Sequence, residues 1–273
     1  KAAPKTTVGA APIKEQVVHF INRPLPRNVP IKTARALLGV EDNKTVPIIR
    51  NPALPEDSEA VFYFPGCGSE RLFSQVGLAT QAMLWHAGVQ TVLPPGYLCC
   101  GYPQDAGGNA AKAEEMTTEN RVLFHRVANT LNYLDIKTVV VSCGTCYDQL
   151  EKYRFEEIFP GCRMIDIHEF LLEKGIKLDG VTGQQYLYHD PCHSPIKTTN
   201  PTALTGKLMG QEVLLSDRCC GESGMFAVKR PDIATQVKFR KQEEIEKNKA
   251  ALPPGEPVKM LTSCPACLQG LSR

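Results

Sequence analysis

The chain has 273 residues, enough for one large core or two smaller ones, and a formal net charge of +2. That charge gives no support to a general nucleic-acid-binding or membrane-surface role, and no apolar run approaches the length of a transmembrane helix. Eleven cysteines stand out. Because strand and helix patterns run throughout, they favour metal or redox chemistry in a reducing cytoplasm over a secreted disulfide scaffold.

Residues 1–58 read as an extended, proline-rich lead-in. The stretch "RPLPRNVP" is typical of extended chain, and "IKTARALLGV" predicts one short helix. We expect this segment to wrap onto the domain that follows, with a disordered tail as the alternative. The chain starts at Lys1 and shows no signal peptide, so we expect a fragment or a processed product.

Residues 59–160 alternate strand and helix patterns and form the first predicted lobe. Short apolar runs predict strands, and apolar residues at helical spacing predict helices between them. The runs are "AVFYF", which ends at Pro65-Gly66-Cys67, "VQTVL", which leads to Cys99, and "TVVV", which ends at Ser142-Cys143. The helical patterns cover Leu72 to Met83 and Met116 to Leu134.

The alternation continues through a connection, residues 161–185, into a second predicted lobe, residues 186–273. In the connection, "RMIDIHEFLLEKGIKL" predicts a strand and a helix, preceded by Cys162. In the lobe, "YLYHD", "EVLLS" and "VKMLT" predict strands. Asn200-Pro201 predicts a helix start, and Ile233 to Ile245 predict a charged helix.

Ten cysteines fall into two sets with the same order of parts: one cysteine, a Cys-Cys-Gly trio, and a CxxC pair. The sets are Cys67, Cys99, Cys100, Cys143 and Cys146, then Cys192, Cys219, Cys220, Cys264 and Cys267. The first intervals are 32 and 27 positions, and the second are 43 and 44. This repeat predicts an internal duplication. Cys162 has no counterpart and is interpreted as a structural thiol.

The predicted fold is therefore α/β, with two pseudo-repeated lobes. Each lobe is a small parallel sheet flanked by helices, with the cysteines at the carboxyl ends of the strands. Five sulfurs would meet on one rim of each lobe, and nearby helix N-termini would face them. Gly101 and Gly221 would permit close approach of the backbone or a positive φ.

Five sulfurs per lobe favour a multi-iron cluster over structural zinc, which takes four ligands. Adjacent cysteines point apart and reach two metal centres more readily than one. All ten cysteines of the two sets are therefore candidate metal and cofactor ligands. Zinc in one lobe stays open as an alternative.

Both halves resemble the CCG cysteine-rich domain family, over roughly residues 60 to 270. The resemblance rests on Cys67, Cys99-Cys100-Gly101 and Cys143/Cys146, and on Cys192, Cys219-Cys220-Gly221 and Cys264/Cys267. The family includes the CCG-containing subunit of heterodisulfide reductase, the iron–sulfur subunits of glycolate oxidase and anaerobic glycerol-3-phosphate dehydrogenase, and lactate-utilisation proteins. The resemblance implies one iron–sulfur cluster per lobe, [4Fe–4S] and in some members non-cubane, with zinc in one lobe of others. The whole stretch also looks like the C-terminal module of fusions to an FAD-linked oxidase.

Several further residues are weaker candidates. In "HDPCH", His189 and His193 are candidate proton donors or tuners beside a cluster, or else part of a strand-end hydrogen-bond network. A set of basic residues would offset cluster charge, receive an anion, or form a solvated face: Lys197, Arg218, Lys229 and Arg230. The pairs Glu114-Glu115 and Glu243-Glu244 are interpreted as solvated. The stretch "GCGSER" is not a dinucleotide fingerprint.

The function hypothesis is an electron-transfer module. It would relay electrons from a flavin-dependent 2-hydroxy-acid dehydrogenase of the lactate or glycolate type, in cis or in trans, to a quinone or a thiol/disulfide acceptor. One alternative is a catalytic subunit like that of heterodisulfide reductase, which cleaves a disulfide at a non-cubane cluster; another is a zinc-stabilised interaction domain. We expect a cytoplasmic location, at the membrane periphery where partners hold it there.

Overall fold

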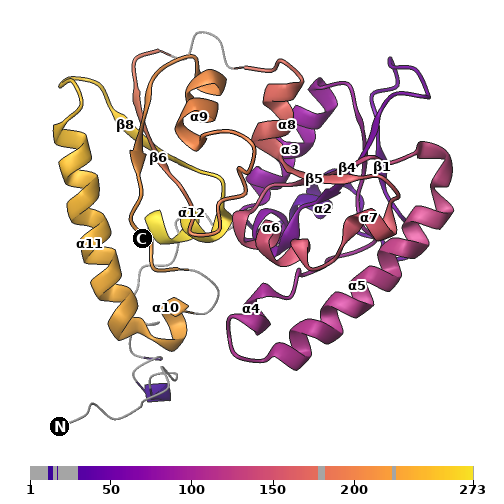
Figure 1. Ribbon diagram of the computed structural model, residues 1–273, viewed down its shortest axis with the longest axis horizontal. Helices are drawn as coiled ribbons and strands as arrows, with labels where there is room; N and C mark the ends of the chain where they lie inside the picture. Colours follow the sequence, from indigo (N-terminus) through magenta and orange to yellow (C-terminus); the bar gives the residue numbers. More distant parts are fainter. Residues whose placement is uncertain (1–11, 15–16, 18–29, 178–181, 223–225, 273) are drawn as a thin grey trace.

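The structure is a computed structural model that describes residues 12–14, 17, 30–177, 182–222 and 226–272. Most of the lead-in before Pro30, including nearly all of "RPLPRNVP", lies outside the described residues. The described chain forms two mostly parallel sheets, each flanked by helices, side by side in one molecule (Figure 1). The predicted α/β class with two lobes is confirmed.

The first sheet has the strand order β1-β3-β2-β4-β5, and only the β1 edge pairs antiparallel with its neighbour. The central strands are buried on both faces, as parallel strands covered by helices must be. The β-branched run "TVVV" suits such a position, because its side chains pack well on a pleated surface. The strands are β1 (Ile48–Ile49), β2 (Ala60–Phe64), β3 (Gln90–Val92), β4 (Thr138–Val141) and β5 (Arg163–Asp166).

The second sheet has the order β7-β6-β8 and is parallel throughout. Its strands are β6 (Gln185–His189), β7 (Val213–Ser216) and β8 (Val258–Thr262). This order repeats that of β3-β2-β4 in the first sheet. In each lobe the strand before the lone cysteine is central. The strand before the Cys-Cys-Gly trio lies on one side of it, and the strand before the CxxC pair lies on the other. The repeat read from the cysteines is thus also a repeat of topology.

Helices fill the intervals between strands. Asn200 caps α9 (Pro201–Met209), since its side chain accepts hydrogen bonds from the amides of Thr202 and Ala203, and Pro201 occupies the first turn as predicted. A π-helical turn, η1 (Gly68–Leu72), follows Cys67. The remaining helices are α2 (Ala34–Leu38), α3 (Ser74–His86), α4 (Tyr102–Asp105), α5 (Ala110–Thr130), the 3₁₀ turn η2 (Asn132–Leu134), α6 (Gly144–Glu151), α7 (Phe155–Ile158), α8 (Ile167–Glu173), α9 (Pro201–Met209), α10 (Phe226–Lys229), α11 (Pro231–Ala250) and α12 (Pro265–Leu271).

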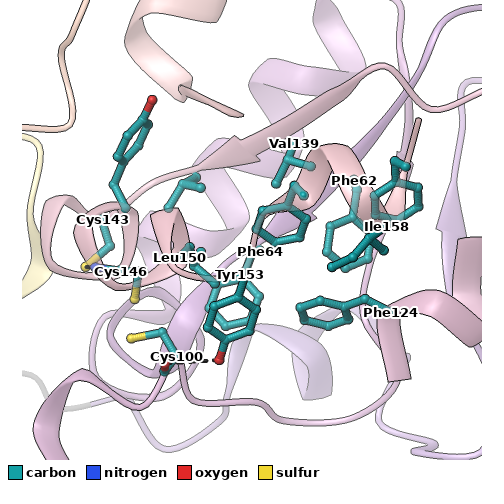
Figure 2. Close-up of a cluster of buried hydrophobic side chains, with 14 of the residues drawn as sticks. Phe62, Phe64, Cys100, Phe124, Val139, Cys143, Cys146, Leu150, Tyr153 and Ile158 are labelled. Atoms are coloured by element: carbon teal, nitrogen blue, oxygen red, sulfur yellow. Dashed lines mark hydrogen bonds between the residues drawn. The ribbon is translucent and has the colours of Figure 1, made fainter. Parts of the chain in front are cut away.

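Two buried clusters form the core. The first lies between the first sheet and α5 to α7, where Phe62, Phe64 and Phe124 pack edge to face beside Tyr153 (Figure 2). It continues into the cysteines of both lobes. The second cluster covers the opposite face of the first sheet and runs through α3, α8 and α9 to β6 of the second sheet. The lobes therefore share a continuous core.

The described end of the lead-in packs on the first lobe, as predicted. Helix α2 contacts η1 and α3, and the buried Arg35 guanidinium pairs with Glu70 at 3.1 Å and donates to the Pro94 carbonyl. The proposed boundaries at 58/59, 160/161 and 185/186 stay predictions. Within the described ranges, no helix combines the length and apolarity needed to cross a membrane.

Candidate metal centre

The five cysteines of the first set meet beyond the carboxyl ends of β2, β3 and β4. Each of these thiols shifts the pKa of the next, in one continuous series that runs Cys67, Cys99, Cys100, Cys146, Cys143. In Figure 2 the sulfurs of Cys100 and Cys146 face each other at one end of the aromatic cluster. Cys143 caps α6, with its sulfur 3.5 Å from the Cys146 amide nitrogen. The predicted gathering on one rim is therefore present in the first lobe.

The second set repeats this series in the order Cys192, Cys219, Cys220, Cys267, Cys264. Cys220, Cys264 and Cys267 are buried, whereas Cys219 is half-buried and Cys192 is exposed. The buried end of each series lies at its CxxC pair, and the more accessible end lies at the lone cysteine. The lone cysteine and the first cysteine of the trio are therefore the more exposed sulfurs of each set.

The two series join at their buried ends. The sulfurs of Cys143 and Cys264, the first cysteines of the two CxxC pairs, lie 4.0 Å apart. Around them the Gly144 amide donates to the Ser263 carbonyl at 3.2 Å, and the Thr145 hydroxyl lies 3.3 Å from the Cys264 sulfur. All ten repeated cysteines therefore form one continuous series across the interface between the lobes.

The surroundings of the junction repeat as well. Tyr63 on β2 hydrogen-bonds to Ser142 at 2.7 Å, and Tyr188 on β6 hydrogen-bonds to Ser263 at 2.9 Å. Each serine immediately precedes the first cysteine of its CxxC pair. These buried tyrosine–serine pairs hold the end of the third strand of each repeat against the central strand, which fixes where the CxxC turn begins.

Backbone contacts hold the Cys-Cys-Gly trios in place. The Asn120 side chain donates to the Cys99 carbonyl at 2.9 Å, and the Tyr153 hydroxyl donates to the Cys100 carbonyl at 3.0 Å, drawn as the dashed line in Figure 2. Gly101 and Gly221 have φ values of 92° and 75°. An added Cβ would lie 3.3 Å from the Ala113 carbonyl oxygen and 3.2 Å from that of Ala234, respectively. Close approach and positive φ were predicted as alternatives, and both glycines show the two together.

The pKa values of neighbouring thiols shift in opposite directions. Hydrogen bonds from Cys100 and Cys67 lower the pKa of Cys99 to about 3, and hydrogen bonds from Cys192 and Cys220 lower the pKa of Cys219 to about 2. The donors show the opposite effect: the hydrogen bond to Cys99, together with burial, raises the pKa of Cys67. Ten thiolates at this spacing would repel one another strongly, so complete deprotonation requires bound cations.

The two histidine candidates differ in their surroundings. His193 is engaged at both ring nitrogens, with the Tyr102 hydroxyl at 2.9 Å and the Asp148 carboxylate at 3.1 Å. His189 is fully buried at the end of β6, beside the second cysteine set. Burial, followed by the nearby charge of Lys241, lowers its pKa.

The sequence pattern of the CCG family, described as a cysteine-rich domain, matches residues 61–151 and 186–272. The chain belongs to the CCG cysteine-rich domain family. The two matched segments contain the two cysteine sets, so each lobe is one CCG repeat.

Several proteins of similar sequence are named as iron–sulfur proteins or as subunits of redox enzymes. An uncharacterized iron–sulfur protein of Methanococcus maripaludis is 26% identical over 246 residues, covering 84% of this chain and 46% of that protein. One subunit of the fumarate reductase (CoM/CoB) of Methanothermobacter marburgensis is 28% identical, covering 75% and 40%. A probable glycolate oxidase iron–sulfur subunit of Bacillus subtilis is 25% identical, covering 80% and 50%. The chain spans about half the length, or less, of these relatives.

The donors of the CCG lobes fit iron–sulfur clusters. All eleven cysteines are free thiols, and ten of them converge in two groups of five. Thiolate sulfur is the usual ligand of iron–sulfur clusters. A single zinc ion would use four donors of a lobe and leave one thiol over. Cys162 is half-buried and lies outside both series, which agrees with its interpretation as a structural thiol.

Two cavities adjoin the cysteines. One, of about 310 Å³, lies between the lobes and is lined by Cys264, Ser142 and Ser263 together with apolar side chains of α3 and α12. His168, hydrogen-bonded to the buried Asp166 at 2.7 Å, also lines it. The other, of about 530 Å³, opens over Cys219 between Arg218 and Arg240. Small molecules therefore have room beside sulfurs of the second lobe.

In α11, Lys241 was missed from the sequence and the exposure of Glu244 was misjudged. Lys241 is 3% exposed, and its ammonium donates to the Ser216 carbonyl at 3.0 Å and to Glu244 at 2.8 Å. The interpretation of Glu244 as solvated is wrong, because its carboxylate also accepts from the Ser216 hydroxyl and is 10% exposed. The i, i+3 spacing of Lys241 and Glu244 is typical of an ion pair on a helix. Because charged residues lie on every side of α11, that spacing does not show which face of the helix is buried.

The basic candidates do not form a single anion site. Lys229 donates to the Gly107 carbonyl of the first lobe at 2.7 Å, and Arg230 pairs with Asp232. Lys197 lies 3.8 Å from Glu151, across the interface between the lobes. Arg218 donates to the Arg240 carbonyl and lines the cavity over Cys219. Lys197 and Lys229 thus join the lobes, and only Arg218 borders a cysteine site.

Proposed function

We propose that this chain binds one iron–sulfur cluster in each CCG lobe and relays electrons. The donor is a flavin-dependent dehydrogenase for 2-hydroxy acids of the lactate or glycolate type. The proposed ligands are the ten repeated cysteines, five per lobe. When bound, such a cluster accepts and releases one electron at a time. The proposed setting is the cytoplasm, with contact to a membrane only through partners.

The observation that carries this proposal is the continuous series of ten sulfurs. It leads from the half-buried Cys67 and Cys99 through the 4.0 Å contact of Cys143 with Cys264 to the half-buried Cys219 and the exposed Cys192. Two centres held by these residues would be separated by little more than the contacting CxxC turns. Electrons would enter at one accessible end and leave at the other.

The donor assignment rests on two supports. The sequence carries no recognised flavin or nicotinamide motif, so a separate domain or subunit must accept the hydride. The similarity to a probable glycolate oxidase iron–sulfur subunit favours a 2-hydroxy acid as the donor's substrate. A cluster relay would divide the two-electron oxidation at the flavin into single-electron steps.

The relay is tested by mixing the reconstituted chain with D-lactate or glycolate, with and without the flavoprotein, and following cluster absorbance without oxygen. Bleaching is expected only when acid and flavoprotein are both present. The Cys162→Ser variant should behave like the unmodified chain, and Cys220→Ser should lose the second-lobe change. Bleaching by the acid alone, or clusters that stay oxidised while the flavoprotein turns over, would refute the relay.

The cavity of about 310 Å³ beside Cys264 favours a second candidate, cleavage of a small disulfide. The similarity to a fumarate reductase named for two thiol coenzymes agrees with thiol/disulfide chemistry. Two electrons and two protons would convert one disulfide into two thiols. Release of thiols from an asymmetric disulfide by the isolated, pre-reduced chain, measured by mass spectrometry, would favour this function over a pure relay.

A further inference from the structure

A nitrogen donor lies among the sulfurs of the second lobe. A ring nitrogen of His189 and the sulfurs of Cys220 and Cys267 all lie within 4.8 Å of one another. Within the described residues, this is the sole group of three or more such donors so close together. All three side chains are buried.

The hydrogen bonding of His189 fixes its tautomer. Nδ1 lies 3.2 Å from the Ser216 carbonyl oxygen, which can only accept, so Nδ1 carries the proton. In the neutral ring Nε2 then carries the lone pair. Nε2 is buried and has no hydrogen-bond partner within the described residues. Metal-binding histidines characteristically donate their second ring nitrogen to a carbonyl or carboxylate in this way.

The ring is also held rigidly. His189 ends β6 and pairs in register with Ser216 on β7 and Thr262 on β8, which places it on the central strand of the sheet. The carbonyl that orients it is fixed in turn by the buried Lys241 ammonium. Side chains on sheet strands hold a ligand geometry better than side chains on loops.

The first lobe has no matching nitrogen. Tyr63 and Tyr188 occupy equivalent positions in the two lobes, because each hydrogen-bonds to the serine before its CxxC pair. Each is also the second-to-last residue of its central strand. The last residues of these strands, Phe64 and His189, are therefore equivalent as well. Phe64 is buried in the aromatic cluster and cannot bind metal. His193, the other histidine of "HDPCH", already uses both ring nitrogens.

We propose that His189 ligates the metal centre of the second lobe through Nε2, as a sixth donor beside the five cysteines. The proposal shares with the proposed function only the requirement that the second lobe binds metal. A sulfur and a nitrogen on one ion lie at most about 4.4 Å apart, the sum of the two bonds. An inward shift of a few tenths of an ångström would therefore let one ion bind His189 with Cys220 or Cys267.

Mixed ligation would make the two centres inequivalent. A neutral imidazole adds a donor without adding negative charge, so the second-lobe centre would differ in ligand number and in reduction potential from the five-thiolate centre of the first lobe.

The test uses the full chain, labelled with ¹⁵N-histidine, reconstituted with iron and sulfide without oxygen, and examined after reduction by pulsed electron paramagnetic resonance. A histidine nitrogen strongly coupled to a centre is expected in the unmodified chain. The coupling should survive in the His193→Phe variant and disappear in His189→Phe, which carries the residue that the first lobe already has. No coupled histidine nitrogen, or a coupling that persists in His189→Phe, would overturn the proposal.

A second measurement is needed if the centre gives no paramagnetic signal or if a variant does not fold. X-ray absorption at the iron and zinc edges of the unmodified chain should show the outer-shell scattering of one imidazole, and sulfur-only scattering would overturn the proposal. The outcomes stay separate from those of the relay. A coupled histidine with no electron flow would refute only the relay, and electron flow without histidine ligation would refute only the ligand.

Discussion

Adjacent cysteines act as bridges within each sulfur series. The pKa of Cys99 responds to the lone Cys67 on one side and to Cys100 on the other, and the pKa of Cys100 responds in turn to Cys146 of the CxxC pair. Cys219 and Cys220 take the same places in the second lobe. Because consecutive side chains diverge, a Cys-Cys pair joins two neighbours that one cysteine could not join.

At this scale we predict that Cys219→Ser or Cys220→Ser removes or converts the second-lobe cluster, with a loss of up to about half of the iron, because serine replaces thiolate poorly. Cys162→Ser should retain the full iron content. Burial raises the pKa of that thiol to about 11, and it lies outside both series. Iron analysis and the reduced-state resonance spectrum are the measurements. An equal loss of iron in all three variants would show that the ligand assignment is wrong.

At the scale of elements, the turn after each trio controls how closely the sulfurs meet. Gly221 adopts a positive φ against the Ala234 carbonyl, as Gly101 does against Ala113. In the Gly221→Ala variant, the positive φ should cost about 1–2 kcal/mol of backbone strain. The added methyl group should also displace α11, which carries Ala234. Lower iron occupancy of the second lobe should follow, measured per folded chain.

Gly175 provides the matched control for this prediction. Its φ is 70°, and an added Cβ would meet nothing within 4 Å. Gly175→Ala should therefore show the backbone strain alone and keep its iron. If both variants lost iron equally, the close approach at Gly221 would not be what positions the trio.

Helix α2 is attached to the first lobe through a buried ion pair. Arg35 and Glu70 have side chains 1% and 6% exposed, and burial raises the pKa of Glu70 against the opposing effect of Arg35. Glu70→Ala should lower the free energy of unfolding by about 3 kcal/mol, because it leaves a buried guanidinium without its partner. Anaerobic urea unfolding measures the loss.

The exposed pair of Lys112 and Glu115 is the comparison. Glu115→Ala should lower the free energy of unfolding far less than Glu70→Ala, since solvent screens such pairs. The double variant Arg35→Met with Glu70→Leu should recover much of the stability. No recovery would indicate that the ion pair itself, rather than the unpaired charge, carries the effect.

At the scale of the whole molecule, the two lobes share both core and sulfurs. The first apolar cluster includes cysteines of both sets, and the second runs from the first sheet to the second. We therefore expect loss of metal from one lobe to loosen the other. Chelation without oxygen should lower the melting temperature in one joint transition, measured by circular dichroism. Two independent transitions would contradict this coupling.

Metal identity is the remaining prediction at this scale. Anaerobic purification should give a brown protein with several irons per chain, because five thiolates per lobe suit multi-iron centres. Metal analysis after reconstitution is the measurement. Iron near zero with about two tightly bound zinc ions would instead support the zinc-stabilised interaction domain.

The strands and the cysteine grouping could be predicted because they depend on local pattern. Short apolar runs such as "AVFYF" and "TVVV" became buried strands, and the sequence spacing of the cysteines anticipated the repeated topology. The burial of Lys241 and Glu244 could not be predicted, because their helix is charged on every side and only packing against β7 selects the buried face. The role of His189 depended likewise on which ring nitrogen the fold would engage.

The sequence by itself determined the class of fold, the two lobes and the two sets of five sulfurs, since periodicity and motif order are properties of the chain. The tertiary structure alone decided that Cys143 meets Cys264 at 4.0 Å, because that contact depends on how the lobes dock. It also separated two histidines four positions apart: docking gives His193 two partners from the first lobe, while Nε2 of His189 stays buried without a hydrogen-bond partner within the described residues. Residue order specifies which groups are present, and packing over long sequence separations specifies which of them meet.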